Sequence, residues 1–180
     1  MEKALDVFEA IKNRRSVRAF TNQPVSDEEV EKLIDAAIWA PSAGNIQPWE
    51  FIVVRQHEVK RGLRKAALNQ TFIEEAPVVI VVCANVWRSE QGYRSRGVNL
   101  FCLQDTAAAT QNMLLAAHAL GLATCWVGAF QEEEATKVLH IPSGLRPVAI
   151  IPVRHAAEKP KARPRRAVSK IVHNETFGRK

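Results

Sequence analysis

The chain has 180 residues, of which 47% are hydrophobic, and its formal net charge is +6. This length suffices for one globular domain and is short for two, so residues 1–180 are expected to form a single domain. Glu2, Lys3 and Asp6 interrupt any apolar stretch at the start. This argues against a signal peptide and a membrane anchor, and it predicts a cytoplasmic protein.

The first third of the chain predicts two helices. Residues 4–13 carry apolar side chains at helical spacing, beginning with Leu5. Ser26 and Glu29 form a capping-box pattern at the start of a second apolar periodicity. Pro41 ends this second helix, because the residue before a proline is disfavoured in the α region.

The remaining elements alternate between strands and helices without regular βαβ repetition. The run Val78–Val82 is continuously β-branched, which is typical of a strand covered on both faces, and it is predicted to be the centre of the sheet. Residues 85–97 are polar and are expected to be irregular. The other predicted strands and helices cover residues 51–54, 57–68, 124–127, 131–139 and 147–153, and residues 168–173 are compatible with an edge strand.

A long helix is predicted over residues 98–120. It is unusually rich in alanine, and Gly121 is well placed as its C-terminal cap. Polar side chains such as Gln104 and Asn112 argue against a membrane span, because they would be costly to bury in lipid. Alanine permits close approach of a second helix, so we expect this helix to have a helical partner.

Three separated segments point to one ligand. Residues 14–18 and 163–166 are two basic clusters, and guanidinium groups bind phosphate oxygens in pairs. The loop of small and polar residues over 41–49 lets the backbone approach a flat ring closely. A phosphate at one end and a polar planar heterocycle at the other describe flavin mononucleotide (FMN). Either basic cluster alone would be typical of a solvated surface.

Several other chemistries lack their motifs. The eight glycines never form G-x-G, so neither a dinucleotide-binding fingerprint nor a P-loop is present. The five histidines form no HExxH, no metal site is expected, and G-x-S-x-G is absent. The three cysteines lack a CxxC pair and are expected to be reduced core thiols. Because the chain has no dinucleotide-binding fingerprint, a nicotinamide donor would have to bind directly over the flavin.

The combination of these segments resembles the nitroreductase family of FMN-dependent oxidoreductases, over about residues 11–173. Four stretches carry the resemblance: residues 14–18 with Phe20, residues 41–49, residues 108–130 and residues 161–173. It implies an α+β fold, a three-layer α/β/α sandwich with a mixed, mainly antiparallel sheet. It also implies a homodimer that exchanges C-terminal strands, with the tail over 158–180 extending across the partner subunit.

The resemblance also assigns roles to individual residues. Arg14, Ser16, Arg163 and Arg165 would surround the phosphate and ribityl chain, with Arg15 making mainly backbone contacts. Arg18 would lie near the N1–O2 edge, where a positive charge stabilises the negative charge that develops on reduction. The other expected flavin contacts are Pro41, Ser42 and Ala43 from the partner subunit, Asn45, either Asn69 or Gln70, and Trp126, Val127, Gly128 and Ala129.

Two of these assignments have structural alternatives. The Gly128 amide could bind flavin N5 and act in catalysis, or Gly128 could only form a tight turn after a strand. Trp126 could pack beside the flavin or belong to the core.

The resemblance implies two-electron hydride transfer from NAD(P)H through flavin N5 to nitroaromatic, quinone or flavin acceptors, by a ping-pong scheme. The alternative within the same fold is a specialised member such as a flavin-destructase or a reductive dehalogenase. An alternative of another class is a basic nucleic-acid-binding module, although the sequence has no nucleic-acid recognition motif, and we expect neither nucleic acid nor a membrane as partner.

Overall fold

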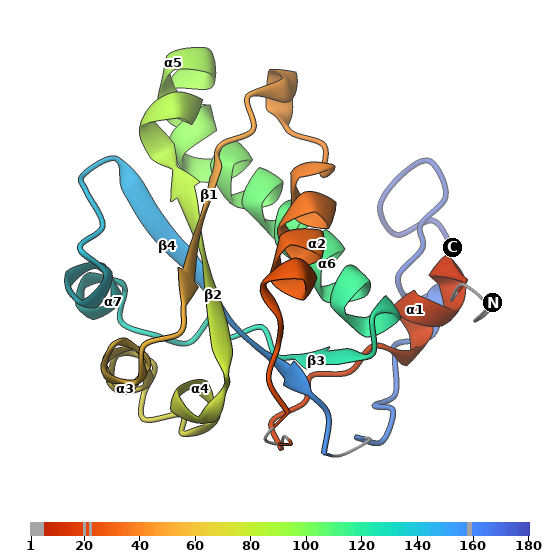
Figure 1. Cartoon of the computed structure of the whole chain (residues 1–180). Coiled ribbons are helices and arrows are strands. Elements are labelled where there is room, and N and C mark those ends of the chain that lie inside the picture. Colours follow the sequence, from red (N-terminus) through yellow and green to blue (C-terminus); the bar gives the residue numbers. More distant parts are fainter. Residues whose placement is uncertain (1–5, 20, 22, 158–159) are drawn as a thin grey trace.

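The computed structural model describes residues 6–19, 21, 23–157 and 160–180 (Figure 1). The predicted apolar residue Leu5, the family residue Phe20 and the first two residues of the expected tail, 158–159, lie outside this range. The helices are α1 (Val7–Asn13), α2 (Asp27–Ile38), α3 (His57–Ala66), α4 (Phe72–Glu75), α5 (Val86–Arg96), α6 (Cys102–Ala119) and α7 (Glu132–Leu139). The strands are β1 (Trp49–Val54), β2 (Val78–Asn85), β3 (Leu122–Thr124) and β4 (Leu145–His155), and the short turns are η1 (Ala43–Asn45), η2 (Gly97–Phe101) and η3 (Val168–Lys170).

The sheet has four strands in the order β1-β2-β4-β3, and every neighbouring pair is antiparallel. An isolated parallel bridge joins Ser16 to Thr124 at the outer edge of β3. The prediction of a mixed, mainly antiparallel sheet is therefore confirmed. Strand β2 lies inside the sheet, and residues 78–84 are fully buried, as predicted for its centre.

Helices cover both faces of the sheet and make three layers (Figure 1). Alternate β2 residues such as Ile80 pack with Leu33 of α2 and Met113 of α6. The intervening residues, such as Val81, pack with Leu63 of α3 and with α4 and α7. This alternation follows from the two-residue period of a strand, and it confirms the α/β/α sandwich.

Two helix ends follow the sequence signals. The Ser26 side chain accepts a hydrogen bond from the Glu29 amide, and the Glu29 carboxylate accepts one from the Ser26 amide, so the capping box forms. Helix α6 ends at Ala119, and Gly121 takes a left-handed conformation with φ of 75°. Helical backbone begins close to the predicted start, because the π turn η2 over residues 97–101 runs directly into α6.

Three expectations about local structure are wrong. Residues 85–97 are mainly the helix α5, which Asn85 caps by accepting from the Arg88 amide. The expectation failed because only Ser89 is buried in α5, so no apolar stripe marks the helix.

The other two concern strands. Strand β3 begins and ends earlier than residues 124–127, which leaves Val127 in an isolated bridge to Ile150. Residues 168–173 contain the turn η3 instead of an edge strand, since a strand requires a neighbouring strand for its hydrogen bonds. Among the described residues, no helix is both long enough and apolar enough to span a membrane.

Candidate active site

The two basic clusters line one cavity of about 590 Å³. The backbone brings the first cluster there, because the Val17 amide donates to the Thr124 carbonyl over 3.0 Å and fixes this segment along the edge of β3. Val17 is buried, while its neighbours face the cavity. The second cluster returns after β4, whose end is joined to Thr21 through the His155 carbonyl. The cavity is lined by Arg14, Arg15, Ser16, Arg18, Pro160, Lys161, Arg163 and Arg165.

This cavity is strongly positive. Six of its lining residues are cationic and none is acidic. Burial, followed by the charges of Arg15 and Arg165, lowers the pKa of Arg14. An anion bound among these side chains would relieve that repulsion. The Arg15 guanidinium donates to the carbonyls of Lys12 and Arg14, so it is already engaged with the protein's own backbone.

Arg18 connects the cavity to the next group of predicted contacts. Its guanidinium carbon lies 5.8 Å from the centre of the Phe72 ring, at the start of α4. Just before this helix, the Gln70 side-chain amide donates to the carbonyls of Ala67 and Ala129, over 3.0 Å and 3.3 Å. Asn69 is exposed and left-handed, with φ of 60°. The Gln70 Nε2 group is thus engaged with two backbone carbonyls, which favours Asn69 as the residue that reaches a ligand.

The segment after β3 lies beside Gln70, whose side chain donates to the Ala129 carbonyl. Val127 is buried and exchanges two hydrogen bonds with Ile150, each of 3.0 Å. Trp126, Gly128 and Ala129 are exposed on either side of it. In the described part of the chain, the Gly128 amide has no hydrogen-bond partner, and a Cβ added there would meet nothing closer than Trp126 Nε1 at 3.9 Å. The Gly128 amide is therefore open to a ligand.

The loop over residues 41–47 forms a separate unit. Gly44, Asn45 and Gln47 all have a left-handed backbone, with φ of 55°, 56° and 53°. The Gln47 amide donates to Ser42 Oγ over 3.0 Å, and the Gln47 side chain donates to Asn45 Oδ1 over 3.0 Å. Pro41, Ser42 and Ala43, which were expected to face a partner subunit's flavin, form the first half of this loop, and Ser42 takes part in its hydrogen bonds.

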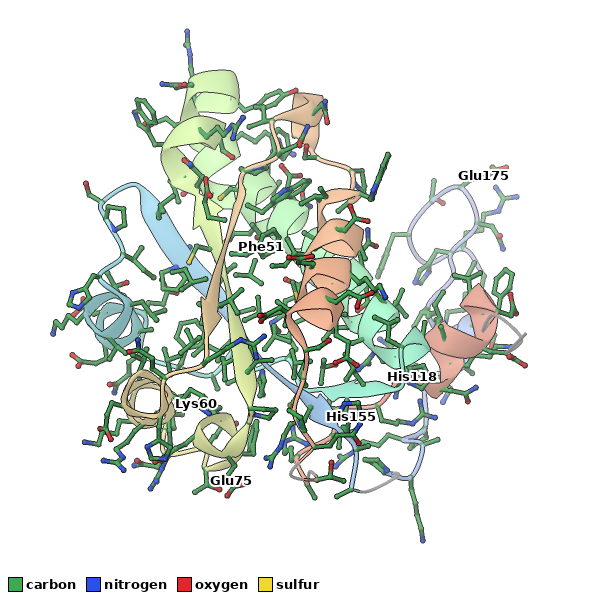
Figure 2. All side chains as sticks on the ribbon, in the orientation of Figure 1. Phe51, Lys60, Glu75, His118, His155 and Glu175 are labelled. Atoms are coloured by element: carbon green, nitrogen blue, oxygen red, sulfur yellow. The ribbon has the colours of Figure 1, made fainter. Side chains whose placement is uncertain are left out.

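The loop and the basic cavity lie at opposite ends of α6. At the start of this helix, Asp105 Oδ1 accepts a hydrogen bond of 3.2 Å from the Ala43 amide. Near its end, His118 lines a second cavity of about 420 Å³ together with Arg14 and Arg15, and Figure 2 labels His118 beside α1. Asp105 and His118 are thirteen positions apart, which is roughly 20 Å along a helix. Within one chain, the two parts of the predicted flavin site therefore do not meet.

The sequence reasoning did not assign Asp105 or Phe72 to the site. Asp105 was visible as a carboxylate within the alanine-rich helix, but its contact with the loop could not be read from the sequence. The three cysteines are buried, and burial raises the pKa of Cys83 to about 12. Burial also raises the pKa of Cys125, although Arg18 and Arg14 act in the opposite direction, so its thiol is not activated.

Known proteins of similar sequence and fold cover most of the chain. A sequence model of the nitroreductase family matches residues 11–72 and 59–153. The chain is 31% identical over 185 residues to the FMN reductase (NADPH) of Bacillus subtilis, which covers 96% of this chain and 74% of that protein.

Two solved structures have a TM-score of 0.88 with this chain. The NfrA1 nitroreductase from B. subtilis is 30% identical and covers 96% of this chain and 75% of its own. The NADPH:FMN oxidoreductase from Vibrio harveyi, solved in complex with NAD+, is 25% identical and covers 97% of this chain and 79% of its own.

Proposed function

The chain belongs to the nitroreductase family, and we propose that this protein is an FMN-dependent oxidoreductase that takes its electrons from NAD(P)H. The observation that carries the proposal is the convergence of two basic clusters on one cavity without an acidic lining residue. A phosphate monoester has a charge of about −1.5 to −2 at neutral pH, and guanidinium groups are well suited to bind it. The chemistry of the cavity therefore fits the phosphate of FMN.

The neighbouring residues fit the rest of the cofactor. Arg163, Arg165, Arg14 and Ser16 would hold the phosphate and the ribityl chain. Asn69 would contact the polar edge of the ring, and Trp126, Val127 and Ala129 would line it. The ring would then lie over the surface formed by Arg18, Phe72, Gln70 and Ala129. Arg18 lies beside the Phe72 ring, and Gln70 donates to the Ala129 carbonyl.

Two residues would act in the chemistry. Bound FMN would supply a ring atom, N5, that accepts a hydride and gives it up again. The open Gly128 amide would donate a hydrogen bond at N5. The Arg18 charge would lie near the N1–O2 edge and stabilise the negative charge that develops there, since fixed charges act strongly in a partly dry site.

A second copy of the chain would complete each site. Helix α6 leaves one row of residues exposed or half-buried, namely Gln104, Ala107, Ala108, Gln111, Leu115 and Ala119. In an antiparallel pair of α6 helices, the start of one meets the end of the other, so the loop of one chain would approach the basic cavity of its partner. Pro41, Ser42, Ala43 and Asn45 would then contact the partner's flavin, and a twofold homodimer would contain two equivalent sites.

Exposed apolar side chains support the same assembly. In the tail, Val168, Ile171 and Phe177 are 70%, 50% and 94% exposed. Trp39, which precedes the loop, is 79% exposed. Large apolar side chains of this kind commonly mark an interface. We infer that the single domain of residues 1–180 extends its tail, from residue 158 onward, across the partner.

Donor and acceptor would use the same pocket in turn. The chain lacks a dinucleotide-binding fingerprint, so the nicotinamide would stack on the flavin, react and leave before a nitroaromatic, quinone or flavin acceptor enters. Initial-rate plots at several acceptor concentrations should give parallel lines. Intersecting lines would require a ternary complex and a separate nicotinamide site. The buried, reduced cysteines favour a cytoplasmic setting.

A nucleic-acid-binding module remains the alternative of another class, because the basic residues would also attract a phosphodiester backbone. Convergence of the basic residues in a cavity favours a small phosphate ligand. The deciding experiment titrates apoprotein with FMN and with riboflavin, which lacks the phosphate, and follows flavin fluorescence. We expect FMN to bind much more tightly than riboflavin. Equal affinities, or binding of oligonucleotides in place of either flavin, would refute the proposal.

A further inference from the structure

Helix α6 contains a buried carboxylate that the proposed chemistry does not use. Asp105 is 7% exposed, although the residues around it in the helix are mostly small and uncharged. Its Oδ2 atom is buried and has no hydrogen-bond partner in the part of the chain that the structure describes. A buried carboxylate with an unpartnered oxygen is unfavourable for folding. The contact made by its other oxygen therefore needs an explanation.

That contact holds the loop over residues 42–47. Asp105 Oδ1 accepts from the Ala43 amide over 3.2 Å, at the first residue of η1. Directly after it, Gly44 and Asn45 are left-handed, and Gln47 is left-handed as well. Asparagine and glutamine enter this conformation at an energetic cost, so the loop requires contacts that fix it.

The loop is also confined on its other side. A Cβ added to Gly44 would lie 2.7 Å from the Tyr93 hydroxyl oxygen, so the Tyr93 side chain of α5 reaches the loop backbone. Asp105 acts from α6 at the same place. The loop is thus held between two helices, and Asp105 supplies the hydrogen bond from α6.

We propose that Asp105 is a positioning residue that holds the loop over residues 42–47 in its ligand-binding shape before the cofactor arrives. This inference rests on the proposed function, in which the loop faces the flavin of the second copy. Preorganisation of this kind would strengthen FMN binding, because the loop would lose little freedom when the ring arrives. Asp105 itself would not touch the flavin.

Three variants test the proposal. Asp105→Ala removes the acceptor, whereas Asp105→Asn keeps a carbonyl oxygen for the Ala43 amide. Asp35→Ala removes an exposed carboxylate on α2 and serves as the control. We expect Asp105→Ala to bind FMN about tenfold more weakly, the value of one hydrogen bond. Asp105→Asn should recover most of this affinity, and the control should match the wild type.

Thermal unfolding of the apoproteins separates positioning from general structural support. Because the substitution also removes a desolvated carboxylate, apo Asp105→Ala should unfold no earlier than the wild type. Unchanged FMN affinity in Asp105→Ala would overturn the proposal. So would a loss of affinity that accompanies an earlier unfolding transition and is not recovered in Asp105→Asn.

A measurement without ligand keeps this inference separate from the proposed function. Amide hydrogen exchange of the peptide around residues 41–48 in the apoprotein should be slow in the wild type and in Asp105→Asn, and about tenfold faster in Asp105→Ala. Equal exchange in all three proteins would show that Asp105 does not hold the loop. If the exchange differs as expected but the wild type does not bind FMN, the proposed function fails and the hold of Asp105 on the loop stands.

Discussion

The basic cavity and the loop over residues 41–47 are built in opposite ways. The cavity joins segments about 150 positions apart in the chain, and its cationic side chains repel one another. The loop is a short local segment whose left-handed residues are held by its own hydrogen bonds and by two neighbouring helices. One part gathers like charges that an anion would neutralise, whereas the other is held by hydrogen bonds within the chain.

This difference indicates how the two parts would cooperate. A cavity of like charges attracts its ligand over a long range and is neutralised when the phosphate binds. A preformed loop provides shape but little attraction. Since α6 separates the two by roughly 20 Å within one chain, their cooperation depends on how two α6 helices pack together. Changes at that helix should therefore have the largest effect.

The first prediction is that Leu115→Glu removes both the dimer and FMN binding. Leu115 is a half-buried member of the exposed row of α6, and an uncompensated charge buried at a helix interface costs about 3–5 kcal/mol. This corresponds to a loss on the order of a thousandfold in dimer affinity. Light scattering and flavin retention after gel filtration measure the two effects together.

Two controls accompany this variant. Gln56→Glu adds the same charge at an exposed position before α3, in the layer on the other face of the sheet, and Leu115→Met keeps an apolar side chain of similar size. Both should remain yellow dimers. A monomer of Leu115→Glu that retains FMN at wild-type affinity would show that one chain suffices for the site.

The second prediction concerns the basic cavity alone. Arg163→Ala with Arg165→Ala should remove two charge-assisted contacts worth about 1.5–3 kcal/mol each, a combined loss on the order of 100-fold or more in FMN affinity. Riboflavin affinity should stay the same, because it has no phosphate. Arg166→Ala is the matched control, since Arg166 is the next arginine and does not line the cavity. A double variant that keeps its full FMN content after dilution would contradict the phosphate assignment.

Much of the fold and of the basic cavity could be predicted from the sequence, because their signals are local. The β-branched run of β2, the capping box at Ser26 and the alanine-rich α6 each follow from a few neighbouring residues. Arginine clusters can also be recognised in the sequence. Because one phosphate could bind both clusters, they could be expected to lie at the same cavity. The order and spacing of these segments in turn supported the resemblance to the family.

The rest depended on contacts between distant residues. Helix α5 has almost no buried side chain, so the pattern of its sequence resembles that of a loop. The hydrogen bond from the Ala43 amide to Asp105 joins residues 62 positions apart, and no rule of sequence spacing predicts it. The commitment of Gln70 to the Ala129 carbonyl likewise became visible only in the structure, and it distinguishes Gln70 from Asn69.

The third prediction tests Arg18, the cavity residue that lies beside the Phe72 ring of α4. Arg18→Ala should keep its FMN but lower the flavin midpoint potential by about 30 mV, which for two electrons corresponds to about 1.4 kcal/mol. The reason is that the Arg18 charge acts most strongly on the reduced ring. Reduction by NAD(P)H should slow in stopped-flow measurements. Arg18→Lys retains the charge and should recover most of the potential; an unchanged potential in Arg18→Ala would place Arg18 outside the ring's reach.

The smallest expected effect is on the pKa of His118. This residue lies near the end of α6 and lines the second cavity together with Arg14 and Arg15. Burial, followed by the charges of Arg14 and Arg15, lowers the pKa of His118 below its usual 6.5. His118 is therefore neutral in the folded protein at pH 7, and its contribution to stability is complete above pH 6.5 and is lost as the pH falls through its lower folded value. A bound phosphate would offset the two arginine charges, so FMN should raise the His118 pKa towards its usual value, while riboflavin should leave it unchanged. NMR titration of the His118 ring protons, assigned with His118→Gln, measures this shift. An equal shift with riboflavin would show that the phosphate does not bind near Arg14 and Arg15.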